Sequence, residues 1–182
     1  MKDITRLFSQ KSHIFYSFEV IEQYIEDAIF FAIHGIKKGE YILFIENDRL
    51  FPLIYKKLEL KLDKYELEKI HHINSLDFYF FNDDFHTPTI IKYFSNYLSP
   101  FLTNNKLIRT WAHVEWGNAK EIIKKIEEFE MEADRFVSEE KLLSVCAYDK
   151  GRLSNEMINS LMKSHQYYMT DYEIHPTYQK LH

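Results

Sequence analysis

The chain contains few of the residues on which several common functional motifs depend. Only four of its 182 residues are glycine, Gly35, Gly39, Gly117 and Gly151, and none of them precedes a Lys-Ser or Lys-Thr pair. A phosphate-binding loop needs glycines, so that backbone N–H groups can surround the anion, and a lysine for its charge. The sequence therefore lacks a standard loop for nucleotide phosphates.

Cysteine and long apolar runs are also scarce. The single Cys146 excludes an internal disulfide, and its place in the apolar run LLSVCAY indicates a small buried residue rather than a redox centre. No apolar stretch approaches the length of a membrane span, and the N-terminal MKDITRLFSQK lacks the apolar core of a signal peptide. We expect a cytoplasmic protein that does not contact a membrane.

Positive charge is too sparse for a nucleic-acid surface. The chain has 23 Lys and Arg against 28 Asp and Glu, and no basic block stands out. We therefore expect no direct contact with nucleic acid. What the chain does contain is apolar side chains, at 46% of all residues, including 15 Phe and 13 Tyr. Aromatic side chains fill cores and also line pockets for small ligands, and the sequence leaves both uses open.

Nine histidines raise the question of metal binding. Three short motifs contain suitable ligands: HH at 71–72, DDFH at 83–86 and HVE at 113–115. None of them has the i, i+4 spacing of a helical zinc site or the cysteine pairs of a zinc ribbon. Neighbouring histidines in a strand also point to opposite faces. We therefore expect no metal ion and no other cofactor.

The hydrophobic pattern predicts alternating strands and helices. Strands are predicted over 13–18, 41–45, 69–73, 107–116 and 142–148, helices over 19–37, 49–61, 87–97, 118–135 and 153–163, and shorter elements over 78–81 and 172–175. Such alternation gives an α/β fold with a doubly wound, mainly parallel sheet and helices on both faces. We expect residues 1–12 to form a polar arm and residues 13–182 to form a single domain.

The predicted strands end in polar and aromatic residues. Ligands of doubly wound sheets bind beyond the carboxyl ends of the strands. These ends carry Tyr16, Glu46, Glu115 and Tyr148, which we predict to be ligand-binding, with His13 at the other end of its strand as a supporting residue. Each of them also has a structural interpretation, such as capping the next helix or closing a polar cluster, and the sequence leaves these open. No nucleophile and base can be paired from local motifs, so we do not expect an enzyme.

Three blocks of the sequence carry a resemblance to a known family. They are HIFY at 13–16, HGIKKGEYILFIEND at 34–48 and FEMEADRFVSEEKLLSVCAYDKGRLSNEMINSLMKSHQYYM at 129–169. Their order resembles the MEDS domain, a sensory domain of methanogen and methylotroph regulators, over about residues 12 to 170. The strand at 107–116 departs from the pattern, because Val114 precedes Glu115 where the family often has glycine.

The resemblance implies both a fold and a function. The implied fold is a degenerate RecA/KaiC-like three-layer sandwich without a functional Walker A loop. The implied function is that of a bacterial sensory domain, which binds a small organic ligand such as a hydrocarbon derivative. Because the sequence shows no DNA-binding or kinase segment, we expect it to signal to a separate kinase or transcription regulator. The alternative is a ligand-free module that docks a kinase, an anti-sigma factor or a copy of itself, and a homodimer is left open.

Overall fold

The computed structural model describes residues 4–81, 84–117 and 122–177. Seven strands form one sheet in the order β3-β2-β4-β5-β1-β6-β7. The strands are β1 (His13–Phe18), β2 (Tyr41–Glu46), β3 (Ile70–Asn74), β4 (Ile108–His113), β5 (Ser144–Asp149), β6 (Tyr167–Thr170) and β7 (Ile174–Pro176). Every neighbouring pair is parallel except β6 and β7. The predicted α/β class with a mainly parallel sheet is confirmed.

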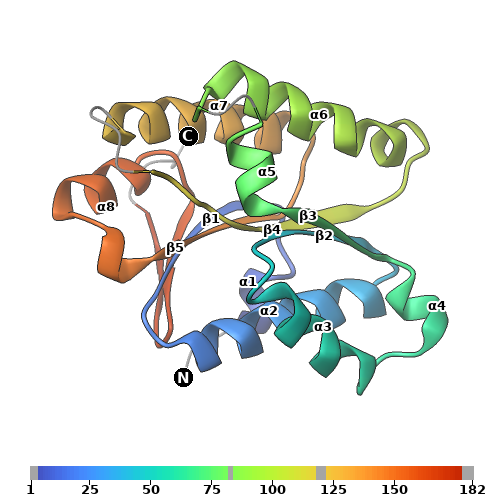
Figure 1. Cartoon of the computed structure of the whole chain (residues 1–182). Helices are drawn as coiled ribbons and strands as arrows, with labels where there is room; N and C mark the ends of the chain where they lie inside the picture. Colours follow the sequence, from blue (N-terminus) through green and yellow to red (C-terminus); the bar gives the residue numbers. More distant parts are fainter. Residues whose placement is uncertain (1–3, 82–83, 118–121, 178–182) are drawn as a thin grey trace.

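Helices cover both faces of the sheet (Figure 1). One face carries α1 (Ile4–Leu7), α2 (Ile21–Lys37), α3 (Phe51–Glu59) and α4 (Lys64–Leu67). The opposite face carries α5 (Ser75–Tyr79), α6 (Thr87–Thr103) and α7 (Ile122–Glu139), while α8 (Asn155–Leu161) lies at the flank beyond a 3-10 turn at Lys150–Arg152. We call these the α2 face and the α7 face. None of the helices in the described residues is long and apolar enough to cross a membrane.

The central strands supply two separate cores. All six positions of β1 and of β4 are buried, as expected for parallel strands covered on both faces. Side chains alternate across each strand, so Ile14, Tyr16 and Phe18 of β1 pack on the α2 face. Phe15 of the same strand packs on the α7 face. Side chains of one strand therefore reach two chemical environments that the sheet separates.

Two predicted helices differ from the observed ones. The helix predicted to stop at Tyr97, before Pro100, continues to Thr103 as α6. The last turn is supported from within, because Thr103 donates to the Ser99 carbonyl at 2.8 Å and Asn104 donates to the Pro100 carbonyl at 2.6 Å. The helix predicted from 118 is described from Ile122 as α7, and its first residues lie outside the described part of the chain.

The short element predicted at 78–81 is a helix that starts earlier. It is α5, and the Asn74 side chain caps it by accepting from the N–H groups of Leu76 and Asp77 at 2.9 and 3.2 Å. The N-terminal residues also differ from expectation. They include α1, and Leu7 and Phe8 are buried in the core of the α2 face rather than forming a polar arm.

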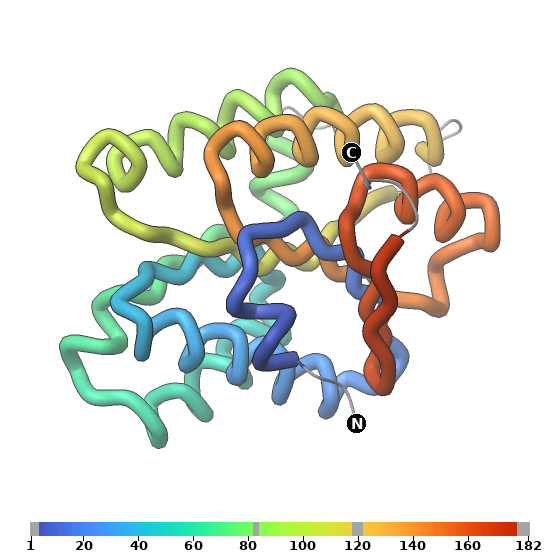
Figure 2. The backbone as a smooth tube through the Cα atoms, turned by 180° about the vertical axis from the view of Figure 1, so that it is seen from behind, coloured from blue at the N-terminus to red at the C-terminus, as the bar shows by residue number. Residues whose placement is uncertain are grey.

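The C-terminal part of the described chain forms a hairpin instead of one edge strand. Strands β6 and β7 pair antiparallel, and β6 extends the sheet beside β1. Figure 2 shows this hairpin running beside the N-terminal segment of the chain toward the start of α2. Its turn brings Asp171 to the loop between β1 and α2, where the side chain accepts from Glu19 N at 2.9 Å.

Candidate functional site

Glu46, predicted to bind a ligand, lies in a closed hydrogen-bond network on the α2 face. It ends β2 and is fully buried. Tyr24 donates to its Oε2 atom, and Trp111 Nε1 donates to the Tyr24 hydroxyl at 2.9 Å. The Oε1 atom lies 2.7 Å from His113 Nδ1 and accepts from Asn47 N at 2.8 Å. Both carboxyl oxygens therefore have partners within the chain, as a buried polar group requires.

Glu115 continues this network toward the surface. Asn47 Nδ2 donates to Glu115 Oε1 at 3.3 Å, and Arg152 Nη1 lies 3.4 Å from Glu115 Oε2. Burial lowers the pKa of His113, but the hydrogen bond to Glu46 and the charges of Glu46 and Glu115 outweigh it, so the pKa is raised above its ordinary value. The structure therefore brings two of the predicted site residues, Glu46 and Glu115, together around His113.

Arg109, which lies on the same face of β4 as His113, does not join this network. It is buried near the other end of β4 and pairs with Glu40. Alternation along a strand puts these residues on one face, but their distance along the strand separates them.

Tyr16 belongs to a different cluster on the α2 face. Its hydroxyl lies 2.9 Å from Asp27 Oδ2 and 2.7 Å from Asp171 Oδ1. The second oxygen of Asp171 accepts from the N–H groups of Glu19 and Val20, at 2.9 and 3.0 Å, immediately before α2. In phosphate-binding folds this junction of strand and helix holds the anion. Here a carboxylate of the chain itself takes that position.

His13 and Tyr148 lie across the sheet, on the α7 face. His13 Nε2 lies 3.3 Å from Cys146 Sγ and 3.5 Å from Glu130 Oε2. Tyr148 donates to Glu130 Oε1, and the ring of His165 stacks on His13 with centroids 3.9 Å apart. Burial raises the pKa of Glu130 above its ordinary value. The five predicted site residues therefore do not converge on one pocket.

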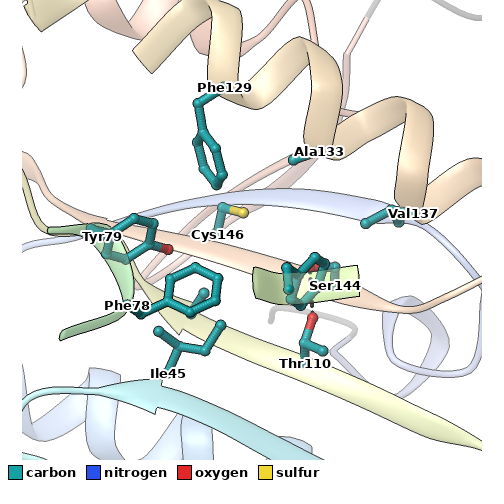
Figure 3. Close-up of a pocket in the computed structure, with 11 residues that line it drawn as sticks. Ile45, Phe78, Tyr79, Thr110, Phe129, Ala133, Val137, Ser144 and Cys146 are labelled. Carbon is teal, nitrogen blue, oxygen red and sulfur yellow. Dashed lines mark hydrogen bonds between the residues drawn. The ribbon is translucent and has the colours of Figure 1, made fainter. Parts of the chain in front are cut away.

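A small cavity lies on the α7 face, between the sheet and the helices (Figure 3). Its volume is about 20 Å³. Its lining is mostly apolar and comes from β2, β4, β5, α5, α6 and α7: Ile45, Phe78, Tyr79, Phe94, Thr110, Ala112, Phe129, Ala133, Val137, Ser144 and Cys146. The Tyr79 hydroxyl, shown pointing into this space in Figure 3, is buried and has no hydrogen-bond partner within the described residues.

The match to known sequences covers the Glu46 network, the residues around His13 and the cavity. The model of the MEDS family, described as MEthanogen/methylotroph, DcmR Sensory domain, matches residues 12–166. The chain belongs to the MEDS family. No curated protein matches the chain in sequence. The MEDS match confirms the family resemblance and gives the chain a sensory role, and it extends from just before His13 to just after His165.

The sequence analysis did not predict roles for Glu130 and Tyr79, which lie within the matched range, or for Asp171, which lies just beyond it. Glu130 left a signal, because the buried apolar stripe of α7 runs through Ile126, Phe129 and Ala133 and Glu130 falls on it at helical spacing. An acidic residue on an apolar stripe must be buried with a partner or protonated. Tyr79 and Asp171 carried no comparable signal, since their positions depend on how α5 and the β6–β7 hairpin pack.

Proposed function

We propose that this sensory domain responds to a small organic molecule that binds in the cavity on the α7 face. The observation that carries the proposal is the Tyr79 hydroxyl, which lines the cavity and has no hydrogen-bond partner among residues 4–81, 84–117 and 122–177. A buried hydroxyl without a partner costs about 1–3 kcal/mol. A ligand with a hydrogen-bond acceptor relieves that penalty.

The lining restricts the chemistry of the ligand. The cavity volume of about 20 Å³ is close to the roughly 10–15 Å³ that one water molecule needs, so a ligand of a few non-hydrogen atoms binds only if the lining side chains move apart. Apart from Tyr79, the polar lining groups are the hydroxyls of Thr110 and Ser144, which are hydrogen-bonded to each other at 2.8 Å. The ligand is therefore a short, mainly apolar compound with one acceptor, such as a small alcohol or ketone.

Helix α5 offers a route from the cavity to a signalling partner. Phe78 and Tyr79 face the cavity, whereas Leu76 on the same helix is 53% exposed and Phe81 just beyond it is 63% exposed. A ligand shifts a protein toward the state that it binds more tightly. Contact with Phe78 and Tyr79 thus changes the exposed apolar surface around α5, which a separate kinase or transcription regulator then reads.

The buried Cys146–His13 pair supports a binding role over catalysis. Burial raises the pKa of the Cys146 thiol, and the charge of Glu130 raises it further. A reactive cysteine instead needs a lowered pKa and access to solvent. Cys146 is buried, so we infer that the chain is not a thiol enzyme.

The test compares the thermal stabilisation of two variants by defined small molecules. The wild type, Tyr79→Phe and Tyr65→Phe are titrated with methanol, ethanol, acetone and chloroform. Tyr65 is 79% exposed and controls for the loss of a phenol. A ligand at a hundredfold excess over its dissociation constant stabilises the fold by about 2.7 kcal/mol.

We expect a saturable rise in melting temperature with an acceptor-bearing compound for the wild type and Tyr65→Phe, and a smaller rise for Tyr79→Phe. Tyr79→Phe alone is expected to be as stable as the wild type or more stable, because it removes an unpaired buried hydroxyl. Equal responses of all three proteins to every compound contradict the proposal.

The exposed apolar surface around α5 also favours a second candidate function, a ligand-free docking module. Leu76 and Phe81 are exposed, and the Phe81 ring stacks on Tyr93 with centroids 5.5 Å apart. Native mass spectrometry separates the two functions. If the chain forms a stable complex with a copy of itself or with a separate protein equally well with and without the small molecule, docking alone is favoured. If that association depends on the small molecule, the sensor is favoured.

A further inference from the structure

We propose that His13, Glu130, Cys146 and His165 bind a divalent transition-metal ion of the zinc type. This His₂CysGlu cluster is fully enclosed on the α7 face, and its four ligand atoms lie within 4.8 Å of one another. It lies apart from the network around Glu46, and the proposal does not depend on the cavity ligand, although Cys146 borders both.

The measured separations suit one central ion. His13 Nε2 lies 3.3 Å from Cys146 Sγ and 3.5 Å from Glu130 Oε2, and His165 Nε2 lies 3.4 Å from Glu130 Oε2. In a tetrahedral zinc site the metal–ligand bonds of about 2.0–2.3 Å place the ligand atoms roughly 3.3–3.8 Å apart. The cluster therefore needs little movement to surround an ion.

Two atoms at the centre lack hydrogen-bond partners. Glu130 Oε2 and His165 Nε2 are both buried, and neither makes a hydrogen bond within the described residues. Both side chains are fully buried, so bulk water does not satisfy them. Buried polar atoms are normally hydrogen-bonded, and an orphaned pair that faces one point indicates a missing partner. A metal ion accepts both lone pairs at once.

Outer contacts orient the ligands toward that point. His13 Nδ1 lies 3.1 Å from the Ser164 carbonyl and His165 Nδ1 lies 2.7 Å from the Leu161 carbonyl. A carbonyl only accepts, so both rings carry their proton on Nδ1 and present the Nε2 lone pair to the centre. Tyr148 donates to Glu130 Oε1 and leaves Oε2 free. This is the outer-shell arrangement of metal-ligating histidines and carboxylates.

Charge and donor type select the ion. One thiolate and one carboxylate cancel the two charges of a divalent ion, so the buried centre is neutral overall, which a site with little water requires. A thiolate and two imidazoles favour zinc, cobalt or nickel over magnesium or calcium. Four protein ligands also leave no open position, which is typical of a structural site. Such an ion joins β1, α7, β5 and the loop between α8 and β6.

The test uses the cobalt spectrum of the full chain. The protein is unfolded in urea with a chelator, freed of both, and refolded with increasing Co²⁺. Because Cys146 is the only cysteine, a thiolate-to-cobalt charge-transfer band identifies that side chain directly. We expect this band together with the visible bands of tetrahedral Co²⁺, saturation at one ion per chain, and displacement by Zn²⁺.

Variants assign the remaining ligands, with circular dichroism confirming that each one folds. We expect Cys146→Ser to lose the charge-transfer band and Glu130→Gln to bind about 100-fold more weakly or worse, while Tyr148→Phe, in the outer shell, weakens binding about 10–100-fold. His86→Gln, at an exposed histidine, controls for surface binding and is expected to match the wild type. Absence of the band in the refolded wild type overturns the proposal, as does an unchanged affinity in Glu130→Gln.

Discussion

Glu46 and Glu130 are both fully buried glutamates on opposite faces of one sheet, and they differ in their hydrogen-bond partners. Each accepts a hydrogen bond from a tyrosine and lies beside a histidine. On the α2 face both oxygens of Glu46 have partners. On the α7 face one oxygen of Glu130 has no hydrogen-bond partner in the part of the chain that the structure describes. On the α2 face Asp171 accepts a hydrogen bond from Glu19 N just before α2, whereas the α7 face contains the cavity.

This difference distinguishes a structural polar cluster from a functional one. A network whose donors and acceptors are all paired fixes one packing arrangement and gains nothing from a ligand. A cluster that contains buried polar atoms without hydrogen-bond partners, beside a cavity, is stabilised further when a ligand or ion binds to those atoms. We therefore expect ligands and ions to act on the α7 face rather than on the α2 face.

The largest expected effect tests the two glutamates with the same isosteric change. Glu46→Gln replaces an acceptor of the network by an amide donor, and we expect it to lower the free energy of unfolding by roughly 3–5 kcal/mol, as when one partner of a buried pair is removed. Glu130→Gln in metal-free protein is expected to change it by about 1 kcal/mol or less, because burial already favours the neutral carboxyl. Urea unfolding at neutral pH measures both. If both variants lower the free energy of unfolding equally, the distinction between the two faces is wrong.

The second comparison concerns how tightly side chains pack on the two faces. A Cβ atom on Gly35 of α2 would lie 2.7 Å from Arg109 Nε and 2.7 Å from Ile42 Cδ1, so Gly35→Ala displaces the buried arginine. Overpacking of this kind costs about 1–3 kcal/mol, more than the roughly 0.5–1 kcal/mol that alanine gains in a helix. Ala133→Val, beside the cavity, is expected to cost about 1 kcal/mol or less.

Gly117→Ala is the matched control for this pair, because a Cβ atom there meets nothing within 4 Å. Chemical denaturation of the three variants decides the matter. If Ala133→Val lowers the free energy of unfolding more than Gly35→Ala does, the α7 face is the more tightly packed of the two.

Much of the fold was predictable from local sequence. Gly39 follows α2 with φ of 81°, a conformation that favours glycine, and the run YILFI forms the buried strand β2. The error at Pro100 has a local cause too, since the hydrogen bonds of the last turn outweighed the usual stop signal. Hydrophobic periodicity and turn residues thus predict which segments form helices and strands.

The candidate site was predictable only in part. Alternation along β4 placed His113 and Glu115 on one face, and the strand order then brought Glu46 to them. Which face a strand-end residue occupies, however, depends on the register of its strand. Tyr148 and Tyr16, both predicted to bind a ligand, lie on opposite faces. The His₂CysGlu cluster joins residues between 13 and 165, and no local spacing encodes it.

Asp171 provides a test of how the backbone N–H groups at the start of α2 obtain hydrogen-bond partners. Asp171→Asn keeps the shape but removes the negative charge that faces Glu19 N and Val20 N at the start of α2. We expect the free energy of unfolding to fall by about 1 kcal/mol, the size of a charge effect at a helix N-terminus. The exposed Glu173→Gln, in the same hairpin, is expected to have little effect. A similar loss in both variants indicates that the hairpin, and not the carboxylate, stabilises this end of α2.

His113 gives the smallest effect, because burial opposes the stabilisation of its charged form by Glu46 and Glu115. Its pKa is raised, so the folded chain binds this proton more tightly than the unfolded chain does. The resulting stability is fully present below the unfolded pKa of about 6.5 and is lost as the pH rises through the higher folded pKa. Between pH 6 and pH 8.5 the free energy of unfolding should therefore fall more for the wild type than for His113→Gln. Urea unfolding of both proteins at the two pH values isolates this residue, since the other histidines contribute equally to each. An identical fall in the two proteins means that the Glu46 network holds His113 by hydrogen bonding alone, without charge.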